Sequence, residues 1–102
     1  MSIRCVQFRA HRKNSLVGFA DIEFPTIGLV VHECPVHQKN GEWWVSFPSR
    51  SYLAADGTTK WVPLIEFAKS AGEARRQFQK QAIAAIHAAA AAQDDDLGAM
   101  LS

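Results

Sequence analysis

Apolar and polar residues alternate along much of residues 3–36, which is typical of strands with one buried face. Successive side chains of a strand point to opposite faces of a sheet, so a period of two separates a buried face from an exposed one. Segments 3–9 and 16–24 alternate, segment 29–36 is a β-branched run, and polar or glycine-containing breaks separate the three. We therefore predict three consecutive strands that pair as an antiparallel meander.

The pair Asn40-Gly41 predicts a tight turn that adds a fourth strand. Both central residues of a type I′ turn need φ > 0, which Asn and Gly tolerate best. The strand after the turn carries Trp43 and Trp44 on opposite faces, and it ends at Pro48, which has no amide to donate. Because both tryptophans cannot lie in the core of one subunit, we expect one to face the helix predicted below. The other is expected to meet a partner subunit or a ligand.

A second turn signal, Asp56-Gly57, precedes a short fifth strand at residues 60–64. Pro63 limits this strand to an edge position or a strand end. We therefore predict a curved antiparallel sheet of four or five strands over residues 3–65.

The period changes from two to 3.6 after Lys69, which predicts one long helix. Ser70 and Glu73 have the spacing of a capping box at its start. The helix is expected to end near Gln93, because the aspartates 94–96 are unfavourable at the negative end of a helix dipole. Its apolar face is formed by Phe78, Ala82, Ala85 or Ile86, and Ala89, with Ile83 at the border. The predicted fold class is α+β: an antiparallel sheet of four to five strands followed by one long C-terminal α-helix.

Length and composition fit one domain at residues 1–93, followed by an acidic flexible tail at residues 94–102. Of the 102 residues, 48% are hydrophobic and 21% are charged, as in ordinary folded proteins. The sequence contains no apolar run of about 18 residues and no signal-peptide pattern, so neither a membrane span nor export is expected. We expect a cytoplasmic protein in which Cys5 and Cys34 stay reduced.

The formal net charge of +1 conceals an uneven distribution. The aspartates 94–96 are three of the 10 acidic residues, which leaves seven acidic residues against 11 basic ones in the rest of the chain. A mildly basic body permits a polyanionic partner without requiring one. The acidic tail is expected to compete with such a partner for the basic surface of the body and so to lower non-specific binding.

A series of short motifs surrounds the predicted hairpin. They are His32-Glu33, Val36, Asn40-Gly41, the run from Trp44 to Arg50, Asp56-Gly57 and Pro63-Leu64. In this order they resemble the septation regulator SpoVG family, most specifically in the Pro-Ser-basic end of the aromatic strand. The resemblance extends from about residue 3 to the middle of the helix. It implies a small sheet packed with a C-terminal helix, a homodimer, and a regulatory role through binding of DNA or RNA.

Six cations lie at predicted strand ends or turns, from which long side chains can reach phosphates. Arg50 is expected to be central, because Pro48 fixes the chain just before it and a guanidinium can grip a phosphate with two parallel hydrogen bonds. If the strands pair in order, Lys39 and Lys60 fall on the same sheet. The full set of candidate nucleic-acid-binding cations is Arg50, Lys39, Lys60, Arg12, Lys13 and Arg9.

Trp44, Tyr52 and Trp61 are candidates for stacking on unpaired bases if they are exposed. The alternative for each is packing in the protein core, which is the commoner fate of a large aromatic side chain. The basic first half of the helix has a similar alternative, since a solvated face explains its charges as well as a nucleic-acid groove does. The basic residues of that half are Lys69, Arg75, Arg76 and Lys80.

Evidence for other chemistry is weaker. His32 and Cys34, with His37 and Cys5 nearby, are zinc ligand types, but their spacing matches no recognised zinc motif, so a structural role is favoured. The carboxylates at positions 21 and 23 are interpreted as solvent-facing. No catalytic signature occurs, so we expect neither an enzyme nor a cofactor, a metal or a small-molecule substrate.

Two classes of function therefore stay open. The first is a dimeric nucleic-acid-binding regulator of the SpoVG type or, alternatively, a single-stranded-DNA-binding transcriptional coactivator like PC4 (positive cofactor 4). The second is a protein-interaction module that binds no nucleic acid. Salt dependence separates the two, because phosphate contacts weaken steeply as salt rises and an apolar protein interface does not.

Overall fold

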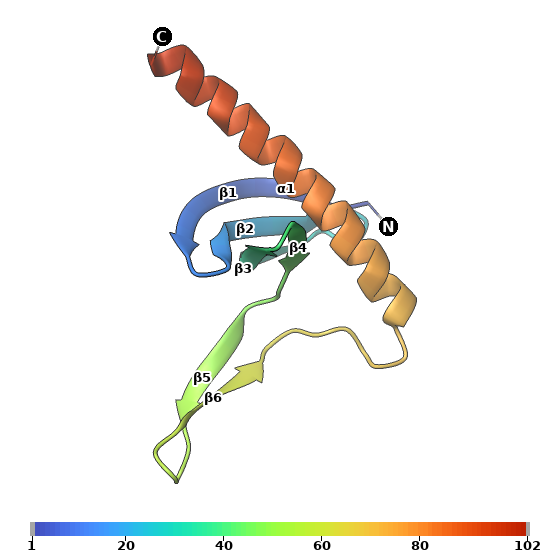
Figure 1. Cartoon of the computed structure of the whole chain (residues 1–102). Coiled ribbons are helices and arrows are strands. Elements are labelled where there is room, and N and C mark those ends of the chain that lie inside the picture. Colours follow the sequence, from blue (N-terminus) through green and yellow to red (C-terminus); the bar gives the residue numbers. More distant parts are fainter. Residues whose placement is uncertain (1, 102) are drawn as a thin grey trace.

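The structure is a computed structural model that describes residues 2–101, with only the backbone described from residue 93 onward. Six strands precede one helix in this part of the chain (Figure 1). Four strands form one antiparallel sheet in chain order, and the last two form a separate antiparallel pair, which confirms the predicted α+β class. The elements are β1 (Arg4–Lys13), β2 (Leu16–Phe24), β3 (Leu29–Lys39), β4 (Glu42–Val45), β5 (Ser49–Leu53), β6 (Thr59–Pro63) and α1 (Gly72–Leu101).

The tight turns of the four-stranded sheet lie where polar residues and glycine predict them. Asn40 and Gly41 have φ angles of 55° and 82° between β3 and β4, as a type I′ turn requires. Asn14 has φ of 55° in the turn between β1 and β2. The meander predicted for these four strands is therefore confirmed.

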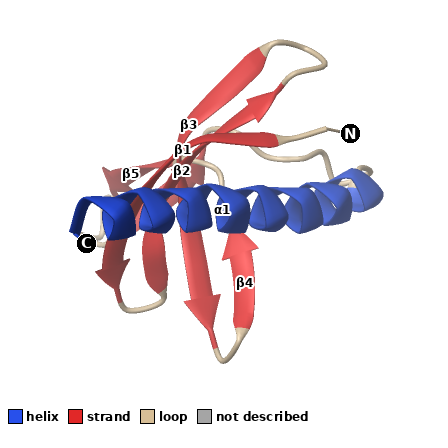
Figure 2. Cartoon of the chain, turned by 90° about the horizontal axis from the view of Figure 1, so that it is seen from above, coloured by secondary structure: helices blue, strands red, loops and turns tan. Residues whose placement is uncertain are grey.

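Helix α1 covers one face of this sheet, and the core lies between them (Figure 2). Phe78, Ala82 and Ile86 are fully buried on the sheet-facing side of the helix, four residues apart, as an amphipathic helix requires. The ring of Trp43 also faces the helix and meets His87 edge-on, with ring centroids 4.6 Å apart. The sheet contributes Phe8, Val17, Ala20, Ile22, Val31, Cys34, Val36 and Val45 to the same core.

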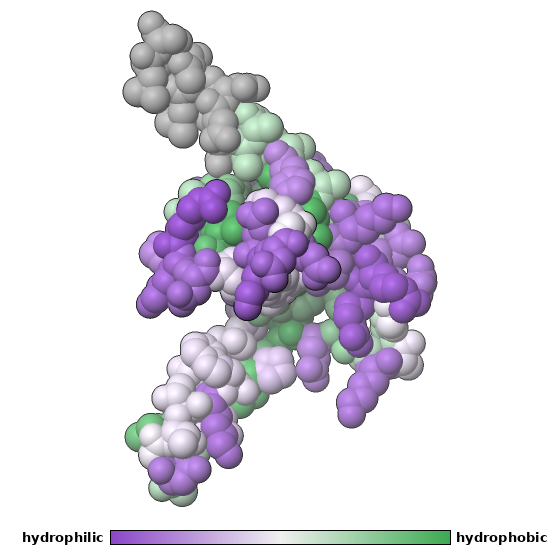
Figure 3. Space-filling model, viewed as in Figure 1, coloured by the Kyte–Doolittle hydropathy of each residue, from purple (hydrophilic) through white to green (hydrophobic). Residues whose placement is uncertain are grey.

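The short strand predicted at residues 60–64 is present as β6, but it does not join the main sheet, which has four strands. Residues 59–63 instead pair with β5, which was not predicted, in a two-stranded antiparallel ribbon (residues 49–63, called the ribbon below). The chain leaves the main sheet after Val45, and Pro48, which has no N–H, precedes the new strand. Figures 1 and 3 show the ribbon standing clear of the sheet and helix.

Two details of the predicted helix are also wrong. The helix continues to Leu101 instead of ending near Gln93, so the aspartates 94–96 lie within it. Glu73 does not reach back to form a capping box, because its carboxylate accepts hydrogen bonds along the helix from Arg76 at 2.7 Å and Gln77 at 3.3 Å. The flexible tail predicted for residues 94–102 stays a prediction, because the side chains of this segment lie outside the described ones. Over the described residues, α1 is not apolar enough to cross a membrane.

Gln79 of α1 closes the outer edge of β4. Its amide oxygen accepts a hydrogen bond from the Val45 N–H at 2.9 Å, and its amide nitrogen donates one to the Val45 carbonyl oxygen at 2.7 Å. Val45 is buried and would otherwise have an unpaired backbone at the sheet edge. The side chain thus takes the place of a neighbouring strand at this residue.

Candidate nucleic-acid interface

The ribbon is a regular hairpin closed by a short turn. The turn contains Gly57 at φ of 86°, and its backbone bonds join Ala54 to Thr58 and Gly57 to Ala54. The Asp56 carboxylate accepts hydrogen bonds from the backbone N–H and the hydroxyl of Thr58, at 3.1 and 2.6 Å. These hydrogen bonds lower the pKa of Asp56, and they hold its carboxylate against the turn.

The register of the ribbon gives its two faces different chemistry. Tyr52 lies opposite Lys60, and Arg50 lies opposite Val62, so these residues share one face. Leu53 and Trp61 lie on the other face, because side chains alternate along each strand. Arg50, Tyr52 and Lys60, called the ribbon cluster below, are all exposed.

The cations of the ribbon cluster have no acidic partner within the described residues. The four ion pairs found there involve neither Arg50 nor Lys60. Their directly opposed neighbours are Val62 and Tyr52, neither of which is an acidic residue. The guanidinium and the ammonium group are therefore available to an anion from solvent.

A second group of candidate residues lies on the face of the main sheet that α1 does not cover. Lys13, Leu16, His37 and Trp44 are opposed in a row across the four strands, and Lys39 shares that face two residues from His37. We call Lys13, His37, Lys39 and Trp44 the sheet cluster. A hollow of about 550 Å³ lies beside it and is lined partly by Lys39 and Trp44.

Two contacts fix the centre of the sheet cluster. The rings of His37 and Trp44 stack with centroids 5.1 Å apart and planes 9° apart. The Ser15 hydroxyl lies 3.1 Å from His37 Nδ1, and burial lowers the pKa of this imidazole. One ring face of Trp44 lies against His37, so that face is not available to a base.

The sequence prediction that Lys39 and Lys60 lie on one sheet is wrong. Lys39 belongs to the main sheet, where its opposed neighbour is Glu42, whereas Lys60 belongs to the ribbon. The carboxylate of Glu42 offsets the charge of Lys39. Among the stacking candidates, Tyr52 joins the ribbon cluster, Trp44 joins the sheet cluster, and Trp61 lies on the opposite face of the ribbon.

Arg9, another candidate cation, is not free, because it pairs with a buried carboxylate. Its Nη2 atom lies 3.4 Å from Asp21 Oδ1, and Asp21 Oδ2 lies 3.2 Å from His32 Nδ1. Asp21 Oδ1 also accepts the Glu33 N–H at 2.9 Å. Asp21 is only 7% exposed, so the interpretation of this carboxylate as solvent-facing is wrong.

A β-bulge explains the cluster around Asp21. His32 and Glu33 of β3 together oppose Asp21, and Glu33 has φ of 58°, which turns its N–H toward the carboxylate. Burial raises the pKa of Asp21, but the hydrogen bonds from Glu33, His32 and Arg9 together lower it by more than burial raises it. The net effect is a pKa below the usual value of 3.8. In the sequence, the one weak sign of this cluster is an acidic residue, Asp21, inside a strand that is predicted to pair with its neighbours.

The other candidate residues lie outside both clusters. Arg12 is exposed near the end of β1, and Arg76 of the basic helix half pairs with Glu73. Cys34 is fully buried, whereas His32 is exposed and pairs with Asp21, so the two do not form a common ligand face. No three of the His, Cys, Asp and Glu side chains described here lie close enough together to hold a metal ion.

Comparison of the chain with family models, curated proteins and solved structures found no match. The geometry of the ribbon and of the open sheet face therefore carries the functional argument.

Proposed function

We propose that the protein is a non-enzymatic regulator that binds DNA or RNA through the ribbon cluster. The observation that carries this proposal is the arrangement of two unpaired cations and one exposed aromatic ring on one face of a projecting ribbon. Cations hold phosphates, and an aromatic face stacks on a base without needing a particular sequence. The resemblance to the septation regulator SpoVG family is part of this proposal.

The shape of the ribbon suits nucleic acid in two ways. The major groove of B-form DNA admits a two-stranded β-ribbon, and a ribbon whose contacts are mainly internal can enter a groove without unfolding the rest of the protein. Residues two apart on a strand are about 7 Å apart, so Arg50 and Tyr52 can also contact neighbouring nucleotides of a single strand. The sheet cluster serves as a secondary contact, because Glu42 weakens the field of Lys39.

A second candidate function is protein interaction, and a specific observation favours it. Leu53 and Trp61, on the face opposite the ribbon cluster, are 74% and 67% exposed. Exposed large apolar side chains that share a face are typical of protein–protein contact sites. The two functions are compatible if this face joins a second copy of the chain while the ribbon cluster binds nucleic acid.

Fluorescence anisotropy with labelled single- and double-stranded DNA and RNA, at about 50 and 200 mM salt, tests the nucleic-acid proposal. We expect Arg50→Glu to weaken binding by roughly tenfold or more and to make the dependence on salt less steep. Lys60→Glu should act similarly, and Lys39→Glu should have a smaller effect. Lys80→Glu is the matched control, because Lys80 is exposed on α1 and belongs to neither cluster.

Three results would favour the protein-interaction function instead. The first is no binding of any nucleic acid at low salt. The second is binding that does not change with salt. The third is an equal loss of affinity in Arg50→Glu and Lys80→Glu, which would indicate a diffuse charge effect without a site.

A further inference from the structure

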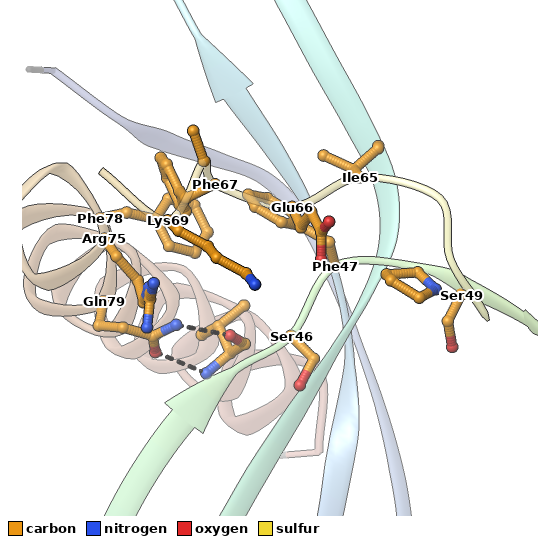
Figure 4. A pocket seen from close by; sticks show the side chains of 13 residues that line it. Ser46, Phe47, Ser49, Ile65, Glu66, Phe67, Lys69, Arg75, Phe78 and Gln79 are labelled. Atoms are coloured by element: carbon orange, nitrogen blue, oxygen red, sulfur yellow. Dashed lines mark hydrogen bonds between the residues drawn. The ribbon is translucent and has the colours of Figure 1, made fainter. Parts of the chain in front are cut away.

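A pocket of about 570 Å³ lies where the ribbon, the end of β4 and the start of α1 meet (Figure 4). It is separate from both clusters described above. Its volume lies within the range of small-molecule sites, which are about 300–1,000 Å³. Three separate segments build it, residues 45–49, residues 63–69 and the first turns of α1, so it exists only in the folded chain.

The floor of the pocket is aromatic. Phe47, Phe67 and Phe78 form a triangle with ring centroids 4.8 to 5.6 Å apart, and Phe78 is fully buried beneath it. Phe47 and Phe67 are only partly covered and line the pocket, and both also line a neighbouring apolar groove. A flat apolar body can rest against these rings with offset or tilted stacking.

The rim of the pocket is cationic. Lys69 and Arg75 line it, and Figure 4 shows the Lys69 side chain extending among the other lining residues. Neither cation forms an ion pair with any residue whose side chain is described. Glu66 is the one acidic lining residue, which leaves the lining with one net positive charge.

Hydroxyl groups complete the polar side. Ser46 and Ser49 line the pocket near the base of the ribbon and can donate to an anionic oxygen. Gln79 also lines it, but its amide is already bonded on both sides to Val45 and so acts as a fixed wall.

We propose that this pocket binds a small aromatic monoanion, with its ring against Phe47 and Phe67 and its carboxylate or similar group between Lys69 and Arg75. The volume suits a small molecule. The aromatic floor favours a flat apolar body, and the two cations of the rim favour an anionic group. This site adds a small-molecule ligand to a protein for which the sequence predicts none, and it does not depend on the proposed binding of nucleic acid.

NMR titration of the ¹⁵N-labelled protein with 1-naphthoate, and with its neutral amide 1-naphthamide, tests the proposal. The two probes have nearly the same shape and differ in charge. We expect 1-naphthoate to shift the amide signals of Ser46, Ser49 and Gln79. We also expect it to bind about tenfold more tightly than 1-naphthamide, because each of the two exposed cations contributes a modest attraction to the carboxylate.

The double variant Lys69→Gln/Arg75→Gln should weaken 1-naphthoate binding about tenfold and leave 1-naphthamide binding nearly unchanged. Both side chains are exposed, so the variant should keep the spectrum of the folded protein. Lys80→Gln is the control of equal charge change on the same helix, and its affinity should stay within about twofold of the original.

Several outcomes would overturn the proposal. One is equal affinity for the two probes, and another is the absence of binding at millimolar concentration. A third is an equal loss of affinity in Lys80→Gln and the double variant. A fourth is a set of shifts centred on Ile27 and Leu29, which line a neighbouring groove of almost entirely apolar character.

Discussion

At the scale of single residues, Asp21 is the side chain whose chemistry contributes most clearly to stability. We expect Asp21→Asn to lower the free energy of unfolding at pH 7 by about 1–3 kcal/mol, because it removes the negative charge that His32 and Arg9 contact in a buried site. Its folded pKa lies below 3.8, so this stabilisation is present above about pH 4 and is lost as pH falls through the folded pKa. The variant should therefore show a weaker loss of stability as the pH falls below about 4.

Urea unfolding at a series of pH values measures this effect. Glu23→Gln is the control on the same strand, because Glu23 pairs with Arg4 at 3.5 Å across a more exposed surface and should change stability by about 0–1 kcal/mol. Equal stability and equal pH dependence in Asp21→Asn and the original protein would show that the cluster contributes nothing net.

The cluster around Asp21 also marks the limit of sequence reasoning at the residue scale. Alternation along residues 16–24 assigns Asp21 to the face opposite Ala20 and Ile22, and that assignment says nothing about burial by a neighbouring strand. The bulge at Glu33 brings a backbone N–H to the carboxylate, but a non-glycine residue with positive φ leaves no mark in the sequence. The separation of Trp43 from Trp44, in contrast, follows from the period of two alone and was predicted.

At the scale of elements, the side chain of Gln79 makes the two hydrogen bonds that join α1 to the backbone of β4. We expect Gln79→Leu to lower the free energy of unfolding by about 1–3 kcal/mol, because the N–H and the carbonyl of buried Val45 would both lose their partners. Amide hydrogen exchange at Val45 should become faster, with a fall of similar size in the free energy of opening at this residue. Gln77→Leu is the control, since Gln77 is exposed and bonds only to Glu73. Unchanged protection of the Val45 amide would contradict the proposed closure of the sheet edge.

The elements that the sequence predicted well are those with a buried face. Strand β2 has the predicted bounds, and Asn40-Gly41 forms the predicted turn, because burial and turn chemistry leave direct patterns. Strand β5 reads Ser-Arg-Ser-Tyr-Leu and is exposed on both faces, so it has no hydrophobic period to detect. The end of α1 was misplaced because the dipole argument gave the aspartates 94–96 more weight than the helix propensity of the alanines before them.

At the scale of the whole molecule, the division of the chain into a covered sheet and a projecting ribbon could not be predicted. The sequence supplies two turn signals and one proline between them, and the same signals fit a fifth strand in one continuous sheet. Long-range pairing decides between these arrangements, and no local pattern encodes it. The candidate cations were therefore identified as a set, but their separation into a ribbon cluster and a sheet cluster required the fold.

The exposed apolar face of the ribbon predicts that the protein self-associates. Leu53 and Trp61 cannot be buried by their own subunit in this arrangement, and a second copy offers an identical face against which they can pack with two-fold symmetry. We expect sedimentation equilibrium at micromolar concentration to show a dimer, and we expect the double variant Leu53→Ser/Trp61→Ser to shift it to a monomer. Tyr52→Ser, on the opposite face of the same strand, should leave the dimer intact.

Dimerisation would also affect the proposed binding of nucleic acid, because two ribbon clusters on one particle bind one strand or duplex with avidity. The monomeric double variant should then bind nucleic acid more weakly although its cations are unchanged, and its dependence on salt should be less steep because fewer phosphates are contacted at once. A monomer in the original protein at tens of micromolar would rule out the apolar face as a dimer contact. Full nucleic-acid affinity in a monomeric double variant would show that one ribbon is sufficient for binding.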